Sequence, residues 1–264
     1  MRKLSAVAIL AWLVAAPASA QLILPTVTPS NGVEFLPRYD FQLSAAGLSN
    51  DNPLYSWDAH FGGQFDVVDY GAGRLGARID YEVVLGDELR IFDPDEGNYT
   101  LEGYATLRAG DSTEVVGVFH HVSRHLSDRL KLGAIAYNEI AARVIHHFAI
   151  DDATTVDGDI EGGWVNQHSY VDYRWYGELH LLARHTINPT FALFARGDGQ
   201  LLGVDPAMYN RGTQYGVLGQ AGVRINGRGA ALEIFGGYER RPDAYPTSLQ
   251  AETWALAGIR VVSR

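Results

Sequence analysis

Apolar and polar residues alternate along much of this chain with a period of two. Between residues 38 and 45 the apolar residues all fall on one face: Tyr39, Phe41, Leu43 and Ala45. The same alternation returns in residues 75–83 and 99–107. A period of two is typical of β-strands that have one apolar and one polar face. The sequence therefore predicts an all-β protein.

Eleven segments of the chain carry this strand signal. They are residues 34–46, 54–70, 74–85, 98–108, 113–123, 133–148, 169–184, 190–202, 213–226, 229–240 and 252–262. Bacterial barrels made of one chain have an even number of strands. We therefore predict an antiparallel transmembrane β-barrel of 10 or 12 strands, and we expect the error in the count to lie within residues 124–168, where the alternation blurs.

The first twenty residues have a composition of their own, which decides between a soluble sandwich and a membrane barrel. Arg2 and Lys3 precede an apolar run over residues 6–16, and Ala18-Ser19-Ala20 follows it. This order is that of a secretory signal peptide. An exported chain with strands of roughly 9 to 11 residues suits a membrane barrel. We expect a signal peptide over residues 1–20 and a barrel over residues 21–264 in the outer membrane of a Gram-negative cell.

The charged residues indicate which partners the chain can have and how the barrel interior is filled. The formal net charge of −10 disfavours nucleic acid as a partner. The expected partners are outer-membrane lipid, lipopolysaccharide and the barrel assembly machinery, and the sequence predicts no oligomeric state. The residues expected to face the lumen carry both signs of charge: Arg38, Arg78, Arg174 and Arg224 with Asp40, Asp58, Asp66, Asp80, Glu102, Asp172, Glu178 and Glu233. We expect them to pair and to close the lumen.

Two connections are rich in acidic residues, from Gly86 to Glu96 and from Asp151 to Glu161. Neither has the spacing of a calcium-binding loop. We expect both to be solvated loops.

One group of residues could carry chemistry, at the end of the apolar segment 113–123. The run Phe119-His120-His121-Val122-Ser123-Arg124-His125 places His121, Ser123 and His125 on one strand face. Residues four apart on a strand are about 13 Å apart, too far for His121 and His125 to bind one metal ion. His121 and Ser123 are about 7 Å apart, so an imidazole can reach a hydroxyl as its base. No metal or cofactor is predicted.

This pattern resembles the His-x-Ser pair of the membrane-embedded serine hydrolases of the outer membrane, the lipid A deacylases and outer-membrane phospholipase A. The resemblance implies that His121 is the general base and Ser123 the nucleophile. In those families an Asn or Glu on the following strand completes the site, and here Asn138 and Glu139 compete for that role. The alternation places Asn138 on the apolar face, so we prefer it.

The stretch from His121 to Asp128 also resembles a His-x-Ser-x-His-Leu-x-Asp segment of an uncharacterised family of bacterial outer-membrane barrels. That resemblance implies a location and a fold but no activity. Three functions are therefore open at this point: a structural or accessory barrel, a serine esterase that acts on lipid A or phospholipid, and a narrow channel.

Overall fold

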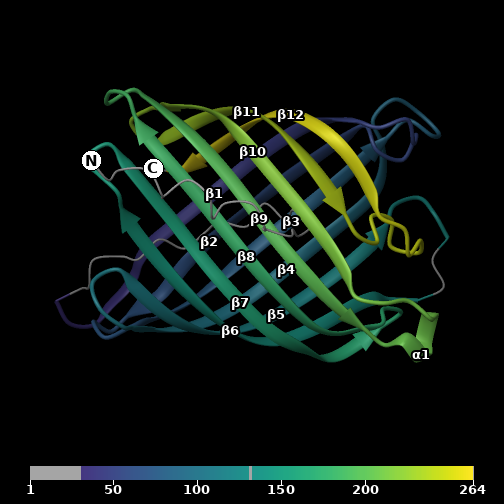
Figure 1. Ribbon diagram of the computed structural model, residues 1–264, viewed down its shortest axis with the longest axis horizontal. Helices are drawn as coiled ribbons and strands as arrows, with labels where there is room; N and C mark the ends of the chain where they lie inside the picture. The colour runs from purple at the N-terminus through teal and green to yellow at the C-terminus, as the bar shows by residue number, and fades with distance from the viewer. Residues whose placement is uncertain (1–30, 131–132, 264) are drawn as a thin grey trace, which may run out of the picture.

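Twelve antiparallel strands form a single closed sheet in the computed structural model, which describes residues 31–130 and 133–263 (Figure 1). The strands are β1 (Glu34–Ser49), β2 (Trp57–Asp69), β3 (Arg74–Gly86), β4 (Asp93–Arg108), β5 (Thr113–Leu126), β6 (Ile135–Ala149), β7 (Thr154–Ser169), β8 (Tyr173–Thr186), β9 (Phe191–Val204), β10 (Gln214–Asn226), β11 (Ala230–Arg241) and β12 (Glu252–Ser263). Each strand pairs with its neighbours in sequence, and β1 pairs with β12 to close the barrel. The predicted antiparallel barrel is confirmed, with twelve strands. The predicted signal peptide, residues 1–20, lies outside the described residues.

The alternation of each strand decides which side chains face the lumen and which face outward. On β1, Leu43 is exposed whereas Gln42 is buried inside the barrel. The pattern repeats on β3, where Ile79 points outward and Arg78 points inward. The inner surface is thus polar and charged, and the outer surface is apolar.

The strand absent from the sequence prediction is β7, and it occupies the second acidic run. Asp157, Asp159 and Glu161 are buried on its luminal side, and Ile160 between them is exposed on the outer face. The expectation of a solvated loop from Asp151 to Glu161 is therefore wrong from residue 154 onward. A carboxylate at every second position forms the charged face of a strand, and ion pairs inside the barrel compensate it.

The first acidic run is also partly a strand. Residues 87–92 form the connection, but β4 begins at Asp93, and Asp93 and Asp95 are buried. Arg129 pairs with both carboxylates from the loop that follows β5. The expectation of a solvated loop is wrong for this second half.

Some positions near the long-loop ends of strands differ from the faces that the alternation predicts. Arg174 was expected in the lumen, but it is exposed and pairs with Asp205, because the register between β8 and β9 shifts between Tyr173 and Trp175. Tyr55 lies in the predicted segment 54–70, where the alternation puts it on the outer face with Trp57, but it precedes β2 and is buried against Trp254 at a ring-centroid distance of 5.2 Å.

The two ends of the barrel differ in the length of their connections. The start of β1 and the end of β12 lie at the end where the strands are joined by three- or four-residue turns, residues 70–73, 109–112, 150–153, 187–190 and 227–229 (Figure 1). Most connections at the other end are longer, up to residues 205–213, which include α1 (Pro206–Tyr209), and residues 242–251. We call these the short-turn end and the long-loop end.

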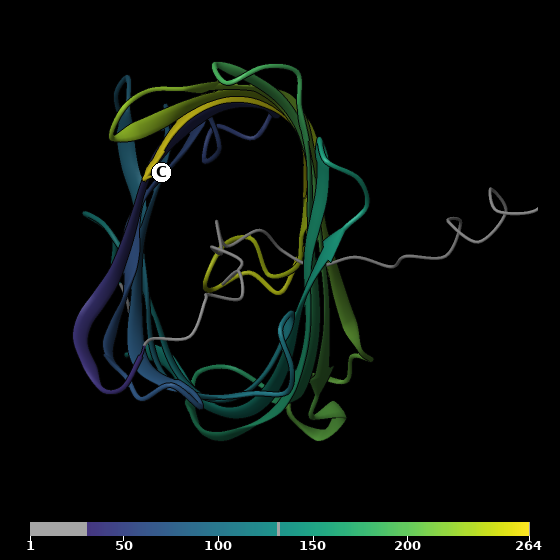
Figure 2. The ribbon, with the colours of Figure 1, turned by 90° about the vertical axis from the view of Figure 1, so that its left-hand side faces the viewer.

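The loop at residues 242–251 folds inward and is fixed to the barrel wall (Figure 2). Arg124 donates hydrogen bonds to the carbonyl oxygens of Asp243 and Ala244 at 2.6 and 2.7 Å, and Tyr173 donates to the Asp243 carboxylate at 2.6 Å. Arg211 binds Asp243 and Asp172. Burial lowers the pKa of Arg211, but its hydrogen bonds to both carboxylates outweigh burial and raise that pKa above its ordinary value. The loop therefore covers part of the lumen at the long-loop end.

Ion pairs between nearby strands line the lumen along its length, and the pairing of luminal charges that the sequence predicts is confirmed. Arg74 pairs with Asp66 and Glu114 near the short-turn end, at 3.0 and 2.6 Å. Further along, Arg143 joins Glu102 to Glu161 at 3.1 and 2.5 Å. Arginines that bridge carboxylates from different strands fill the interior and satisfy buried charge.

Aromatic side chains gather on the outer face toward both ends of the barrel. Exposed aromatic residues toward the long-loop end are Trp57, Tyr81, Trp164, Trp175, Tyr215 and Tyr238; toward the short-turn end they are Phe35, Tyr39, Tyr70, Phe148 and Phe191. Two such girdles around an apolar band are typical of outer-membrane barrels. Within the described residues, no helix is long and apolar enough to cross a membrane.

Candidate functional site

The predicted histidine and serine lie on the outer face of β5, near its long-loop end. Phe119 and His125 on the same face are exposed, whereas His120 is buried in the lumen. Ser123 lies three residues before the end of β5 and pairs in register with Tyr99 of β4. The chemistry-bearing side chains thus face the surroundings of the barrel rather than its interior.

Asn138 on the neighbouring strand β6 holds His121. The two residues are register partners, and Nδ1 of His121 lies 2.6 Å from Oδ1 of Asn138. The Asn138 amide nitrogen donates in turn to Oε1 of Gln167 on β7, at 2.9 Å. Because the amide nitrogen faces Gln167, its oxygen faces His121, and Nδ1 of His121 must carry the proton. Nε2 of His121 then keeps a lone pair, which is the form that a general base requires.

Ser123 makes its hydrogen bond to a different histidine from the one the sequence favours. Its Oγ lies 3.0 Å from Nε2 of His125, and no hydrogen bond joins it to His121 among the described residues. The Tyr99 ring stacks on His125 with centroids 5.3 Å apart and lies 5.8 Å from His121. Ser123 is only 5% exposed between these rings. Two histidines therefore flank the serine on this face: His121, which Asn138 holds, and His125, which contacts the serine hydroxyl.

Glu139, the alternative to Asn138, is on the opposite face of β6. It is 7% exposed and lines a cavity in the lumen. Consecutive strand residues point to opposite faces, so the barrel wall separates Glu139 from His121. Of the two candidates, only Asn138 contacts the histidine.

Three residues of this site are absent from the sequence prediction as partners: His125, Tyr99 and Gln167. The short turn at residues 109–112 fixes the register between β4 and β5, so the position of Tyr99 opposite Ser123 could have been predicted. Gln167 could not, because its strand β7 was not identified.

A second polar cluster lies in the lumen, where ligand atoms of Asp58, His60 and Glu82 fall within 4.8 Å of one another. Such a set could bind a metal ion in principle. Here Arg241 already binds the carboxylates of Asp58 and Glu82, at 2.6 and 2.7 Å. The guanidinium supplies the positive charge that a metal would bring, so we assign no metal to this cluster.

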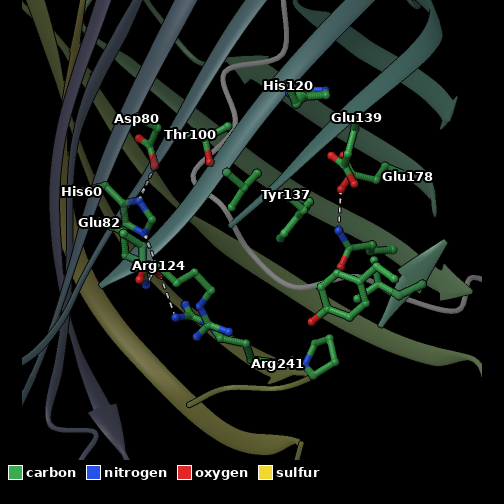
Figure 3. Close-up of a pocket in the computed structure, with 16 residues that line it drawn as sticks. His60, Asp80, Glu82, Thr100, His120, Arg124, Tyr137, Glu139, Glu178 and Arg241 are labelled. Atoms are coloured by element: carbon green, nitrogen blue, oxygen red, sulfur yellow. Dashed lines mark hydrogen bonds and ion pairs between the residues drawn. The ribbon is translucent and has the colours of Figure 1, made fainter. Parts of the chain in front are cut away.

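The luminal cavity has a volume of about 130 Å³ and lies between β2 and β9 on the inner wall (Figure 3). Arg124 and Arg241 lie at one side of it, and Glu139 and Glu178 lie next to each other at another. Tyr137 and Tyr173 form part of the wall with their rings edge to face, 5.3 Å apart.

Solved structures of outer-membrane barrels share the fold of this chain. Outer membrane phospholipase A from Escherichia coli is 11% identical, with a TM-score of 0.53, and the match covers 87% of this chain and 98% of that chain. The Salmonella typhi outer membrane phospholipase dimer with bound calcium has the same identity and TM-score, and 87% of this chain and 91% of that chain are covered. The KdgM porin is 7% identical with a TM-score of 0.48, over 84% of this chain and 97% of that chain.

At these identities the matches show the fold alone, which is that of outer-membrane β-barrels. No family model matches the sequence. No curated protein matches it either.

Proposed function

We propose that this protein is an outer-membrane serine esterase that hydrolyses acyl-ester lipids of the outer leaflet. The observation that carries the proposal is the hydrogen bond of 2.6 Å from His121 to Asn138, two residues from Ser123 on the outward face. It gives His121 the tautomer of a general base next to a hydroxyl nucleophile. Ser123 and His121 are our catalytic residues, and Asn138 orients the base.

The position of this site on the barrel suits a lipid substrate. The apolar outer band between two aromatic girdles supports insertion in a membrane. In outer-membrane barrels the short turns face the periplasm and the longer loops face the cell exterior. Ser123, near the long-loop end of β5, would then lie at the level of the outer leaflet. An acyl-ester bond of a neighbouring lipid can approach it sideways.

The reaction follows from these groups. The Ser123 hydroxyl turns from His125 toward His121 by rotation about χ1, between staggered rotamers. Its Oγ bonds to the ester carbonyl carbon while Nε2 of His121 takes the proton, and Asn138 stabilises the resulting imidazolium. The ester C–O bond then breaks, and the imidazolium returns the proton to the leaving alcohol. Water attacks the acyl-serine in the same way and releases a fatty acid.

The lumen gives no comparable support for a channel. Arginine–carboxylate pairs line its wall, and the loop at residues 242–251 covers part of the long-loop end. A solute would have to pass this loop and a wall whose charges are already paired.

Fatty acid release from defined lipids tests the proposal. The folded full chain is mixed with phosphatidylethanolamine in one reaction and with lipopolysaccharide in another, and free fatty acids are measured by mass spectrometry. We expect release in at least one reaction, and a loss of at least roughly 1000-fold in the Ser123→Ala variant. The control is Ser127→Ala, in the loop after β5, which we expect to keep the wild-type rate.

Two results would overturn the proposal. A wild-type protein that releases fatty acid from neither lipid would return the barrel to a structural or accessory role. A Ser123→Ala variant with undiminished release would place the activity elsewhere.

A further inference from the structure

The luminal cavity contains a buried carboxylate that has no partner. Glu139 is 7% exposed and lines the cavity, and it takes part in no hydrogen bond or ion pair within the described residues. The charged groups that act on it most strongly are the carboxylates of Glu178 and Glu161. A buried carboxylate without a counter-charge is costly, and the interior of this barrel otherwise pairs its charges.

The positive groups around the same cavity are already engaged. Arg124 binds Glu96 and the loop carbonyls, and Arg241 binds Asp58, Glu82 and Glu239. His60 contacts Asp58 and Asp80, and His120 contacts Glu161 at 2.8 Å. None of these groups pairs with Glu139 in the described part of the chain.

Further hydrogen-bond acceptors lie beside Glu139. Gln200 donates to Oε1 of Glu178 at 2.6 Å, and its own Oε1 is buried without a hydrogen bond. The other Glu178 oxygen lies 3.4 Å from His180, which Asp198 binds more closely at 2.9 Å. This side of the cavity therefore offers the unpaired Glu139 carboxylate and the amide oxygen of Gln200, next to a Glu178 carboxylate that Gln200 and His180 contact.

The rest of the wall is mixed: the engaged arginines and histidines, with Asn98 and Thr100, line one part of it, and aromatic and apolar side chains line another. Tyr137 and Tyr173 present their rings to the cavity, and Leu202 and Val122 complete its apolar surface. A bare divalent ion takes about six oxygen ligands, more than this side supplies. An ammonium group instead donates three hydrogen bonds, and aromatic rings attract it. The volume of about 130 Å³ is that of about four water molecules, enough for a short alkyl chain.

We propose that this cavity binds a small primary ammonium ion, with its charged group on Glu139, Glu178 and Gln200 and its alkyl part against Tyr137 and Tyr173 (Figure 3). The site is on the opposite face of the barrel wall from Ser123. It does not depend on the esterase proposal.

Calorimetry and thermal unfolding with n-butylammonium chloride test the site on the folded full chain in detergent micelles. Sodium chloride at the same ionic strength, magnesium chloride and n-butanol serve as comparison solutes. We expect saturable binding of n-butylammonium and a rise in the unfolding temperature, because a ligand that binds the folded state alone stabilises it. The other three solutes should not reproduce this rise.

Glu139→Gln keeps the shape of the side chain and removes its charge. We expect it to weaken n-butylammonium binding at least tenfold, whereas Asp111→Asn, in an exposed turn at the short-turn end, should leave binding unchanged. Mobility on an unheated gel checks that each variant forms the barrel.

Three outcomes would overturn the inference. One is a wild-type protein that binds no n-butylammonium, which would mean that Glu139 is neutral and has no ligand. The second is a Glu139→Gln variant that binds as tightly as wild type. The third is saturable binding of magnesium alone, which would assign the cavity to a metal ion.

Discussion

At the scale of single residues, the esterase that we propose depends first on the amide of Asn138. The amide nitrogen of Asn138 donates to Gln167, so the amide oxygen of Asn138 faces His121 and holds the proton of His121 on Nδ1. In the reaction that we propose, this hydrogen bond strengthens when His121 becomes charged. The outward histidines His146 and His185 are also held through Nδ1, each by a threonine hydroxyl, but neither has a serine two residues away on its strand.

We therefore predict that Asn138→Ala slows fatty acid release roughly 10- to 100-fold. A hydrogen bond to a charged group is worth about 1.5–3 kcal/mol, and each 1.4 kcal/mol is tenfold in rate. The measurement is kcat on the lipid that the wild type hydrolyses. His121→Ala should lose at least tenfold more activity than His125→Ala. The reverse order would make His125, which contacts Ser123, the base.

Single arginines in buried ion pairs also contribute to the stability of the barrel. Arg74 is fully buried and joins Asp66 and Glu114. We predict that Arg74→Ala lowers the free energy of unfolding by about 3–5 kcal/mol, because it removes the paired cation of Asp66 and leaves Glu114 only the more distant Arg108, at 3.7 Å. Urea unfolding of the barrel in lipid vesicles measures the change.

The matched control is Arg90→Ala. Arg90 is more than half exposed and pairs with the exposed Asp128 and, at 3.3 Å, with Asp93, which Arg129 also binds, so its removal should change stability little. Equal effects of the two substitutions would contradict the assignment of the luminal pairs as the stabilising ones.

At the scale of strands, the alternation of apolar and polar residues predicts most of the barrel but not β7. On β7 the inward positions are Asp157, Asp159 and Glu161, and several of the others are glycines, which give no apolar signal. The charged face of a strand then has the same composition as an acidic loop. Only the neighbouring strands β6 and β8, which pair with it along its length, distinguish the two.

The candidate site is also predicted only in part by the sequence. Alternation places His121, Ser123 and Asn138 on one face, and the structure has them there. The hydrogen bond between Ser123 and His125 depends on how the side chains pack around Tyr99. The alternation of apolar and polar residues does not predict such side-chain packing. Gln167 depends on β7, and so it was missed together with that strand.

Single cysteines test the faces of β7, because the chain has none of its own. We predict that Ile160→Cys and Trp164→Cys react with a membrane-soluble maleimide in lipid vesicles, since both residues are exposed on the outer face. Val165→Cys should be protected, because Val165 packs inside the barrel against a cluster of buried apolar residues that includes Tyr173 and Tyr176. Equal labelling of Trp164→Cys and Val165→Cys would contradict the assignment of these two residues to opposite faces of β7.

At the scale of the whole molecule, the barrel wall separates two kinds of site. The outer face carries the histidine and serine residues near the long-loop end, and the lumen carries ion pairs and a small cavity. The likeness to outer membrane phospholipase A extends to the fold of the barrel, at 11% identity. The activity that we propose therefore rests on His121, Asn138 and Ser123 themselves.

The most direct test of this account is whether Ser123 is an activated nucleophile. The folded full chain is treated with an alkyl fluorophosphonate, which forms a covalent adduct with activated serines, and the modified peptide is identified by mass spectrometry. We predict one adduct, on Ser123, that forms much more slowly in the His121→Ala variant. The absence of an adduct, or an adduct on another serine, would contradict the account.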